Sequence, residues 1–280
     1  MERILTVRDM QARAEALRRE GKRIGFVPTM GYLHEGHLSL IDEAKKHSDI
    51  VVVSVFVNPT QFGPHEDLES YPRDIDRDEA LAASRGAGLM FYPSVKEMYP
   101  GTQQTWVQVE DLTGVLCGAS REGHFRGVST VVTKLFHIVK PHVAVFGQKD
   151  AQQAAVIMKM AADLNMDIRI LVAPIVREAD GLAMSSRNVR LTPENRKKAV
   201  ILSQSLFGIR EGLLKGQPAG ALLEEARAAI SAVPGAKLEY LELRSYPALE
   251  ELTELRGTCL AAVAARFGDV RLIDNVMIKI

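Results

Sequence analysis

Apolar positions in the first two-thirds of the chain switch repeatedly between strand-like runs and helical spacing. The run at residues 50–57 is almost entirely β-branched, which is typical of a strand buried on both faces. Further strands are predicted at residues 24–27, 89–92, 142–146 and 168–176. Helices are predicted after a Thr6 cap and at residues 37–47, 75–85, 128–139 and 150–164. Repeated strand–helix–strand units predict an α/β fold with a doubly wound parallel sheet and helices on both faces.

The last third has a different pattern. Thr192 followed by Pro193 predicts the start of a helix that runs to about residue 214, and a second helix follows at residues 219–232. Strand-like alternation then appears at residues 238–241, 260–265 and 270–280. We therefore expect an α/β domain over residues 1–180 and a smaller α+β domain with an antiparallel sheet over residues 181–280.

Composition narrows the class of protein. The 280 residues carry 35 Lys and Arg against 35 Asp and Glu, which argues against a nucleic-acid partner. Cys117 and Cys259 are the only cysteines, too few for a disulfide scaffold. The N-terminus lacks a signal-like apolar core, and apolar runs are far shorter than the about 20 residues of a membrane helix. We expect a cytoplasmic protein with no membrane partner.

Candidate chemistry gathers just after the predicted strands, where parallel sheets bind ligands. After the first strand, residues 28–37 contain His34 and His37, spaced to share a face of the first helical turn. Gly31 and Gly36 allow close approach of a backbone or ligand, and a helix N-terminus favours phosphate. Zinc ligands or two surface histidines are the alternatives, although the zinc-protease helix spaces its histidines four apart.

Three other segments carry polar side chains at equivalent places. Gln61 follows the buried strand and suits a hydroxylated, carboxylated molecule, or it is a solvated turn residue. Lys149 follows a later strand and can reach phosphate, unless it is a surface lysine. Ser185, Ser186 and Arg187 supply donors in a loop that could close over a triphosphate or simply link domains.

The sequence contains no P-loop and no Gly-x-Ser-x-Gly elbow. A group of acidic residues follows the Gln61 segment. The acidic residues are expected to form a solvated face, with a magnesium ligand among them as the alternative. They are Glu66, Asp67, Asp74, Asp76 and Asp78.

Five strings resemble those of the pantothenate synthetase (pantoate–β-alanine ligase) family. They occur in the family's order between residues 26 and 188. They are Phe26-Val27-Pro28-Thr29-Met30-Gly31-x-Leu33-His34-Glu35-Gly36-His37, Phe56-Val57-Asn58-Pro59-x-Gln61-Phe62, His124-Phe125-Arg126-Gly127-Val128, Phe146-Gly147-x-Lys149-Asp150-x-Gln152-Gln153 and Arg177-Glu178-x-Asp180-Gly181-Leu182-x-Met184-Ser185-Ser186-Arg187-Asn188. The C-terminal third matches in length and pattern rather than in motif.

The resemblance implies a Rossmann-like fold of the nucleotidylyltransferase superfamily, which includes class I aminoacyl-tRNA synthetases. It also implies ATP-dependent synthesis of pantothenate from pantoate and β-alanine, with Mg²⁺, in a homodimer. Pantoate would attack the α-phosphorus of ATP to give pantoyl adenylate and pyrophosphate. The amine of β-alanine would then release pantothenate and AMP.

The resemblance assigns site residues as well. The catalytic residues would be His34, His37, Lys149 and Arg187, with His37 as proton donor, while Gln61 and Gln153 would bind pantoate and Gln61 would also lie near β-alanine. ATP would contact Met30, Gly31, Tyr32, Leu33, His34, Glu35, Gly36, His37, Gly147, Gln148, Lys149, Asp150, Val176, Met184, Ser185, Ser186 and Arg187.

The sequence departs from the superfamily pattern at one loop. Ala183 and Ser186 stand where the Lys-Met-Ser-Lys-Ser motif has its lysines, so Lys149 and Arg187 would supply the positive charge. No metal ligand is assigned. Another nucleotidyl or aminoacyl transferase, or a catalytically silent nucleotide-binding protein, are the alternative functions. The neutral chain with no anticodon-reading domain disfavours the first, and the intact His34, His37, Lys149 and Arg187 disfavour the second.

Overall fold

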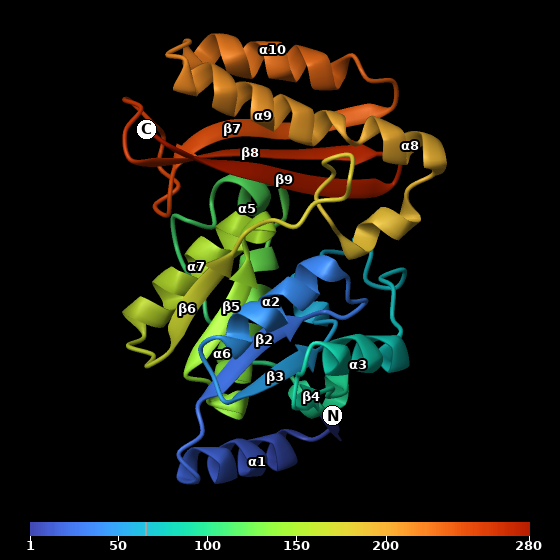
Figure 1. Ribbon diagram of the computed structural model, residues 1–280, viewed down its shortest axis with the longest axis vertical. Helices are drawn as coiled ribbons and strands as arrows, with labels where there is room; N and C mark the ends of the chain where they lie inside the picture. Colours follow the sequence, from blue (N-terminus) through green and yellow to red (C-terminus); the bar gives the residue numbers. More distant parts are fainter. Residues whose placement is uncertain (65) are drawn as a thin grey trace. The chain divides into compact units, whose positions relative to one another are not determined.

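The computed structural model describes residues 1–64 and 66–280 (Figure 1). Contacts within the chain divide it into two compact units. Unit 1 comprises residues 1–110, 121–147 and 156–174, and unit 2 comprises residues 111–120, 148–155 and 175–280. In the described part of the chain, no helix has the length and apolar character needed to cross a membrane. The domain roles predicted for residues 1–180 and 181–280 stay predictions.

Unit 1 is built on a six-stranded sheet in which every neighbouring pair is parallel. The strands are β1 (Glu2–Ile4), β2 (Ile24–Thr29), β3 (Ile50–Val55), β4 (Leu89–Phe91), β5 (Val143–Gly147) and β6 (Arg169–Ala173), in the order β1-β4-β3-β2-β5-β6. The chain moves from β2 outward to β3 and β4, then returns to β5 on the other side of β2. Strand order therefore reverses between β2 and β5, the place where such sheets bind ligands.

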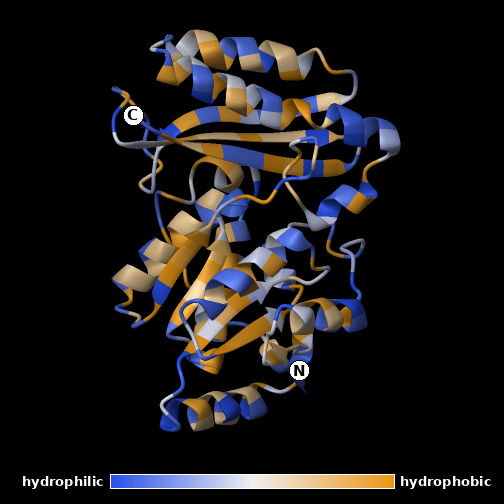
Figure 2. Cartoon of the chain, viewed as in Figure 1, coloured by the Kyte–Doolittle hydropathy of each residue, from blue (hydrophilic) through white to orange (hydrophobic). Residues whose placement is uncertain are grey.

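Helices cover both faces of this sheet, as predicted. They are α1 (Val7–Arg19), α2 (Glu35–Lys45), α3 (Ile75–Ser84), α4 (Val95–Met98) and α6 (His124–Val139), while α7 (Ala151–Asp163) begins in unit 2 and ends in unit 1. On one face, Leu38 and Ile41 of α2 join the same core as Val53. On the other face, the Phe136 ring of α6 lies 6.4 Å from the rings of both Phe26 and Phe146. Figure 2 shows hydrophobic residues concentrated along the strands between these layers.

Unit 2 contains a three-stranded antiparallel sheet, which confirms the predicted α+β character of the C-terminal third. Its strands are β7 (Ala236–Ser245), β8 (Thr258–Phe267) and β9 (Val270–Lys279), and its helices are α5 (Leu116–Ser120), α8 (Pro193–Lys198), α9 (Ile201–Leu214) and α10 (Ala219–Ser231). One core joins Leu206 and Ile230 of the helices to Val263 of β8. A separate core joins Leu116 of α5 to Leu260.

Several predicted element boundaries differ from those of the structure, and two of the differences have a clear physical cause. The strand predicted at residues 24–27 was expected to end before Pro28, but β2 continues through Pro28 to Thr29. Proline is tolerated because β5 pairs only with Gly25 and Phe26, so no partner strand needs the N–H that Pro28 lacks. The single helix predicted to reach residue 214 is divided into α8 and α9. There the Leu202 N–H donates to the Ala199 oxygen, an i→i+3 bond that tightens the chain between the two helices.

Candidate active site

His34 and His37 together form the start of α2. His34 is the N-cap residue, and its Nδ1 accepts the Gly36 N–H at 3.1 Å, while Nδ1 of His37 accepts the His34 N–H at 3.3 Å. The two ring centroids lie 4.1 Å apart. Because each Nδ1 accepts a backbone N–H, the proton of each neutral imidazole is on Nε2. The cap also explains why α2 starts at Glu35, two residues before the predicted start.

The zinc alternative finds no ligand set. Within residues 1–64 and 66–280, no group of three His, Cys, Asp or Glu side chains could hold a metal ion. A zinc site of the usual kind takes at least three such protein ligands. The histidine pair is instead arranged by backbone hydrogen bonds at a helix N-terminus, where an anionic ligand is favoured.

A buried carboxylate fixes the loop that leads to the histidines. Asp78 of α3 is only 1% exposed, and its oxygens accept the N–H groups of Tyr32 at 2.7 Å and Leu33 at 2.6 Å. Burial raises the pKa of this carboxyl even though the two N–H groups oppose the shift. Gly31 has φ +87°, and a Cβ there would lie 2.9 Å from Asp78 Oδ2. The loop conformation therefore requires glycine at this position.

The expectation that Asp78 belongs to a solvated acidic face is wrong. Helical spacing could have indicated that Asp78 is buried, because Ala82, one turn further along α3, is fully buried against the sheet. Asp78 also lines a cavity of about 130 Å³ together with Met30, Gly31 and Asp74. Two carboxylates thus lie beside the loop that sequence reasoning assigned to the nucleotide.

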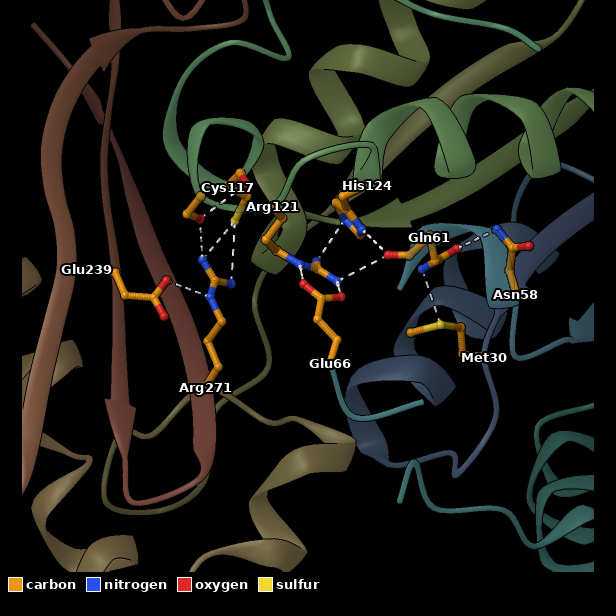
Figure 3. Close-up of polar contacts among 10 residues, drawn as sticks. Met30, Asn58, Gln61, Glu66, Cys117, Arg121, His124, Glu239 and Arg271 are labelled. Atoms are coloured by element: carbon orange, nitrogen blue, oxygen red, sulfur yellow. Dashed lines mark hydrogen bonds and ion pairs between the residues drawn. The ribbon is translucent and has the colours of Figure 1, made fainter. Parts of the chain in front are cut away.

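Gln61 lies close to the same loop within unit 1. It ends the 3₁₀ turn η1 (Pro59–Gln61) and is 8% exposed. Its Nε2 donates to Met30 Sδ at 3.3 Å, and its Oε1 accepts from Asn58 Nδ2 at 3.1 Å (Figure 3). Tyr99 Oη donates in turn to Asn58 Oδ1 at 2.8 Å. The structure therefore brings together Met30 and Gln61, which the sequence placed in one site.

His124 supports the backbone of Gln61. Its Nδ1 lies 2.8 Å from the Gln61 carbonyl oxygen, and its Nε2 lies 2.9 Å from Arg121 Nη1 (Figure 3). A carbonyl only accepts and a guanidinium only donates, so Nδ1 carries the proton and Nε2 accepts. The string that contains His124 was recognised in the sequence without a role. The structure shows that His124 holds η1 in place.

Glu66 completes this network and is likewise not part of a solvated face. Both of its oxygens accept from Arg121 at 2.6 Å, and its side chain is 20% exposed. Burial alone would raise the pKa of the Glu66 carboxyl, but the Arg121 guanidinium outweighs burial and holds the pKa below its ordinary value. No local sequence pattern predicts this ion pair, because Glu66 and Arg121 are far apart along the chain.

The predicted residues of unit 2 begin with the turn after β5. Lys149 lies in the 3₁₀ turn η2 (Gln148–Asp150), with its Nζ 3.8 Å from Asp150 Oδ2 and its side chain 20% exposed. Gln153 is half-buried on the first turn of α7. The neighbouring Gln152 has a structural role, because its amide bonds the backbone of Cys117, Leu112 and Val115.

The predicted serine-rich loop follows a hairpin-like turn. The Met184 N–H donates to the Val176 oxygen at 3.0 Å, so these two predicted residues are adjacent. Ser185 Oγ accepts the Arg187 N–H at 3.2 Å and caps the 3₁₀ segment η3 (Ser186–Arg190). Ser186 is 6% exposed. The loop thus contains a capped 3₁₀ segment and belongs to unit 2.

The fold and these contacts define a Rossmann-like α/β protein with a histidine-capped helix beside the reversal of strand order. The sequence matches the Pantoate-beta-alanine ligase family over residues 2–277. The chain therefore belongs to this family and is a ligase, which confirms the resemblance seen in its motifs.

Individual relatives agree over almost the full length. The pantothenate synthetase of Pelotomaculum thermopropionicum is 56% identical over 274 residues, covering 98% of this chain and 97% of that protein. The crystal structure of pantothenate synthetase from Thermus thermophilus has a TM-score of 0.94 at 47% identity, with 99% of each chain covered. The ligase from Francisella tularensis, complexed with Beta-gamma ATP and Beta-alanine, has a TM-score of 0.83 at 34% identity, covering 99% of this chain and 97% of that one.

Proposed function

We propose that this protein condenses pantoate with β-alanine, using ATP to activate the pantoate carboxylate. In the first step a pantoate carboxylate oxygen bonds to the α-phosphorus of ATP, and the bond to pyrophosphate breaks to give pantoyl adenylate. In the second step the β-alanine nitrogen bonds to the acyl carbon. AMP leaves, the nitrogen loses a proton, and pantothenate is formed.

The observation that carries this proposal is the histidine-capped start of α2. The first step spreads negative charge over the α-phosphate and the departing pyrophosphate, so catalysis rests on positioning and charge stabilisation. His34 and His37 are oriented by backbone bonds, and α2 adds the positive end of its dipole. The relative from Francisella tularensis, with its bound nucleotide and β-alanine, supports the same substrates.

The remaining roles are proposed residue by residue. Lys149 and Arg187 supply positive charge to the phosphates, and Ser185 and Ser186 belong to the same nucleotide-binding set. Gln61 and Gln153 bind pantoate through amide donors and acceptors. No protein nucleophile is needed, since the substrate carboxylate performs the attack.

Magnesium fits the residues beside the nucleotide loop. A Mg²⁺ ion bound to a triphosphate needs only one or two protein carboxylates, and Asp74 and Asp78 line the cavity next to Met30. These carboxylates would hold the ion, which neutralises phosphate charge when bound. A homodimer and a cytoplasmic location are further proposals that rest on the family resemblance.

The test of the function is exchange of labelled pyrophosphate into ATP. We expect exchange to require pantoate and not β-alanine, because adenylation precedes amide formation. An exchange rate that is the same with and without pantoate would contradict the proposed reaction. Formation of pantothenate and AMP in equal amounts on addition of β-alanine checks the second step.

His37→Ala tests the histidine pair within that assay. We expect at least a ~100-fold fall in the adenylation rate, as for removal of a donor that stabilises the transition state. His47→Ala is the matched control, because His47 follows the other end of α2 and contacts Glu43. Near-normal turnover by His37→Ala would show that the pair does not act in catalysis.

A further inference from the structure

Two adjacent polar residues are buried in the middle of β9. Asp274 and Asn275 are each 3% exposed, in a strand whose other inward positions are mostly apolar. Asp274 shares a strand face with Val276 of the core under α9, and Asn275 shares the opposite face with Met277. Burying such groups is unfavourable unless every polar atom finds a partner, so their contacts show what they hold.

Asn275 uses its whole side-chain amide on the turn that contains Lys149. Its Nδ2 donates to the carbonyl oxygens of Gln148 at 2.9 Å and Lys149 at 3.0 Å. Its Oδ1 accepts from Gln148 Nε2 at 3.2 Å. Two hydrogen bonds from this amide therefore fix the backbone from which the Lys149 side chain projects, and the third holds the Gln148 side chain.

Asp274 holds the segment that leads into the serine-rich loop. Its two oxygens accept from the Arg177 guanidinium at 2.7 and 2.9 Å, and Arg177 also donates to the Gly181 oxygen at 2.9 Å. Residues 177 and 183 form an antiparallel bridge just before Met184. The ion pair therefore fixes the turn from which residues 184–187 continue.

The two contacts are joined through the backbone of β9. Asp274 Oδ1 accepts the Asn275 N–H at 2.7 Å, and the Asn275 oxygen accepts from Arg177 at 3.3 Å. A shift in either side chain is thus transmitted to the other. Without these two side chains, the half-buried Arg177 guanidinium and the carbonyl oxygens of Gln148 and Lys149 would lose these partners, so the pair holds both segments in one arrangement.

We propose that Asp274 and Asn275 are positioning residues for ATP, setting the backbone of both the Lys149 turn and the segment before residues 184–187. This inference rests on the proposed function, in which these two segments bind the nucleotide. The pair touches no substrate. Its effect is to hold donors at the positions that adenylation requires, where a displacement of about 1 Å can cost ~100-fold in rate.

Two substitutions of similar shape separate positioning from charge. Asn275→Asp puts an oxygen against two carbonyl oxygens and adds a negative charge, whereas Asn275→Leu removes the hydrogen bonds without adding charge. We expect both variants to raise the KM for ATP or lower the adenylation rate by about tenfold or more. The KM values for pantoate and β-alanine should change less than about twofold. Asn165→Asp, on an exposed turn after α7, is the charge-matched control.

The outcomes are distinct. An effect of Asn275→Asp alone would mean that charge acts on ATP and would overturn positioning, as would normal ATP kinetics in both variants. If the use of ATP, pantoate and β-alanine were impaired to the same extent and the Tm were lowered, the role of the pair would be merely structural. If neither variant folds, Asp274→Asn, which keeps its shape beside Arg177, must show the ATP-specific defect. Absence of pantoate-dependent exchange in the unaltered protein would instead refute the proposed function itself.

Discussion

At the scale of single residues, the ion pair between Glu66 and Arg121 gives a pH-dependent contribution to stability. The pKa of Glu66 in the folded protein lies below its ordinary value of 4.5. A carboxyl with a lowered folded pKa stabilises the fold fully above its ordinary pKa, and the contribution is lost as pH falls through the folded pKa. The pair should therefore matter at neutral pH and matter little in acid.

Glu66→Gln tests the direction of this pH dependence. We expect the variant to have a lower free energy of unfolding than the unaltered protein at pH 7, with the difference shrinking as the pH falls below about 4. Urea unfolding at several pH values measures the difference. Glu250→Gln, at an exposed position, is the control and should show no such trend. A difference that grows toward low pH would contradict the assigned pKa direction.

The residues that sequence reasoning found and those it missed differ in the range of their contacts. The placement of His34 and His37 together at a helix start was predictable because their hydrogen-bond partners lie within one helical turn. Asp78 and Glu66 were misjudged because their partners, Tyr32 and Arg121, are distant in sequence. A carboxylate in a polar stretch is normally solvated, and only the fold reveals which backbone N–H or guanidinium it meets.

At the scale of elements, the close packing of α6 on η1 depends on Gly127. A Cβ at this position would lie 2.3 Å from the Thr60 oxygen, a backbone atom that cannot move aside without shifting η1. Asn58 Nδ2 also donates to the Gly127 oxygen at 3.2 Å. The glycine therefore sets the distance between α6 and the turn that carries Gln61.

Gly127→Ala should displace η1 and weaken pantoate use. We expect the KM for pantoate to rise about tenfold or more, with a loss of stability of about 1–3 kcal/mol from overpacking. Gly208→Ala is the matched control, since Gly208 is also inside a helix but has open space around it. The control should gain up to about 1 kcal/mol from helix propensity. Steady-state kinetics and urea unfolding measure both effects, and a neutral Gly127→Ala would refute the close packing.

Element types were predicted well because apolar periodicity is a local property. The β-branched run at residues 50–57 gave a buried strand, and Thr6 caps α1 as expected. Boundaries failed where long-range pairing decides, as at Pro28, whose missing N–H is harmless only because β5 stops pairing at Phe26. The short strand β1 was missed since three residues carry too little pattern.

At the scale of the whole molecule, alternation of strands and helices predicted the α/β and α+β parts. Which residues belong to each compact unit could not be predicted, because residues 111–120 and 148–155 group with the C-terminal residues in unit 2. The reason is visible at Gln148 and Lys149, whose carbonyls are held by Asn275, more than a hundred residues away. Patterns of hydrophobicity do not specify such a pairing.

ATP binding is proposed to depend on His37 and on Lys149, and the effect of ATP on stability makes each contribution measurable. A ligand that binds only the folded state adds about 2.7 kcal/mol at 100 times its Kd, so ATP should raise the Tm. Lys149→Ala and His37→Ala should each reduce that rise. Lys159→Ala, an exposed lysine paired with Asp163, should keep it.

The kinetics of Lys149→Ala distinguish a role of this lysine in ATP use from a role in β-alanine use. Because the lysine is proposed to act on phosphate, its loss should impair ATP use while the KM for β-alanine stays nearly unchanged. If only the β-alanine KM rose and the ATP-induced rise in Tm remained, Lys149 would belong to the acceptor side of the reaction. The Asn275 variants would then be expected to change β-alanine use as well, since they act through the same turn.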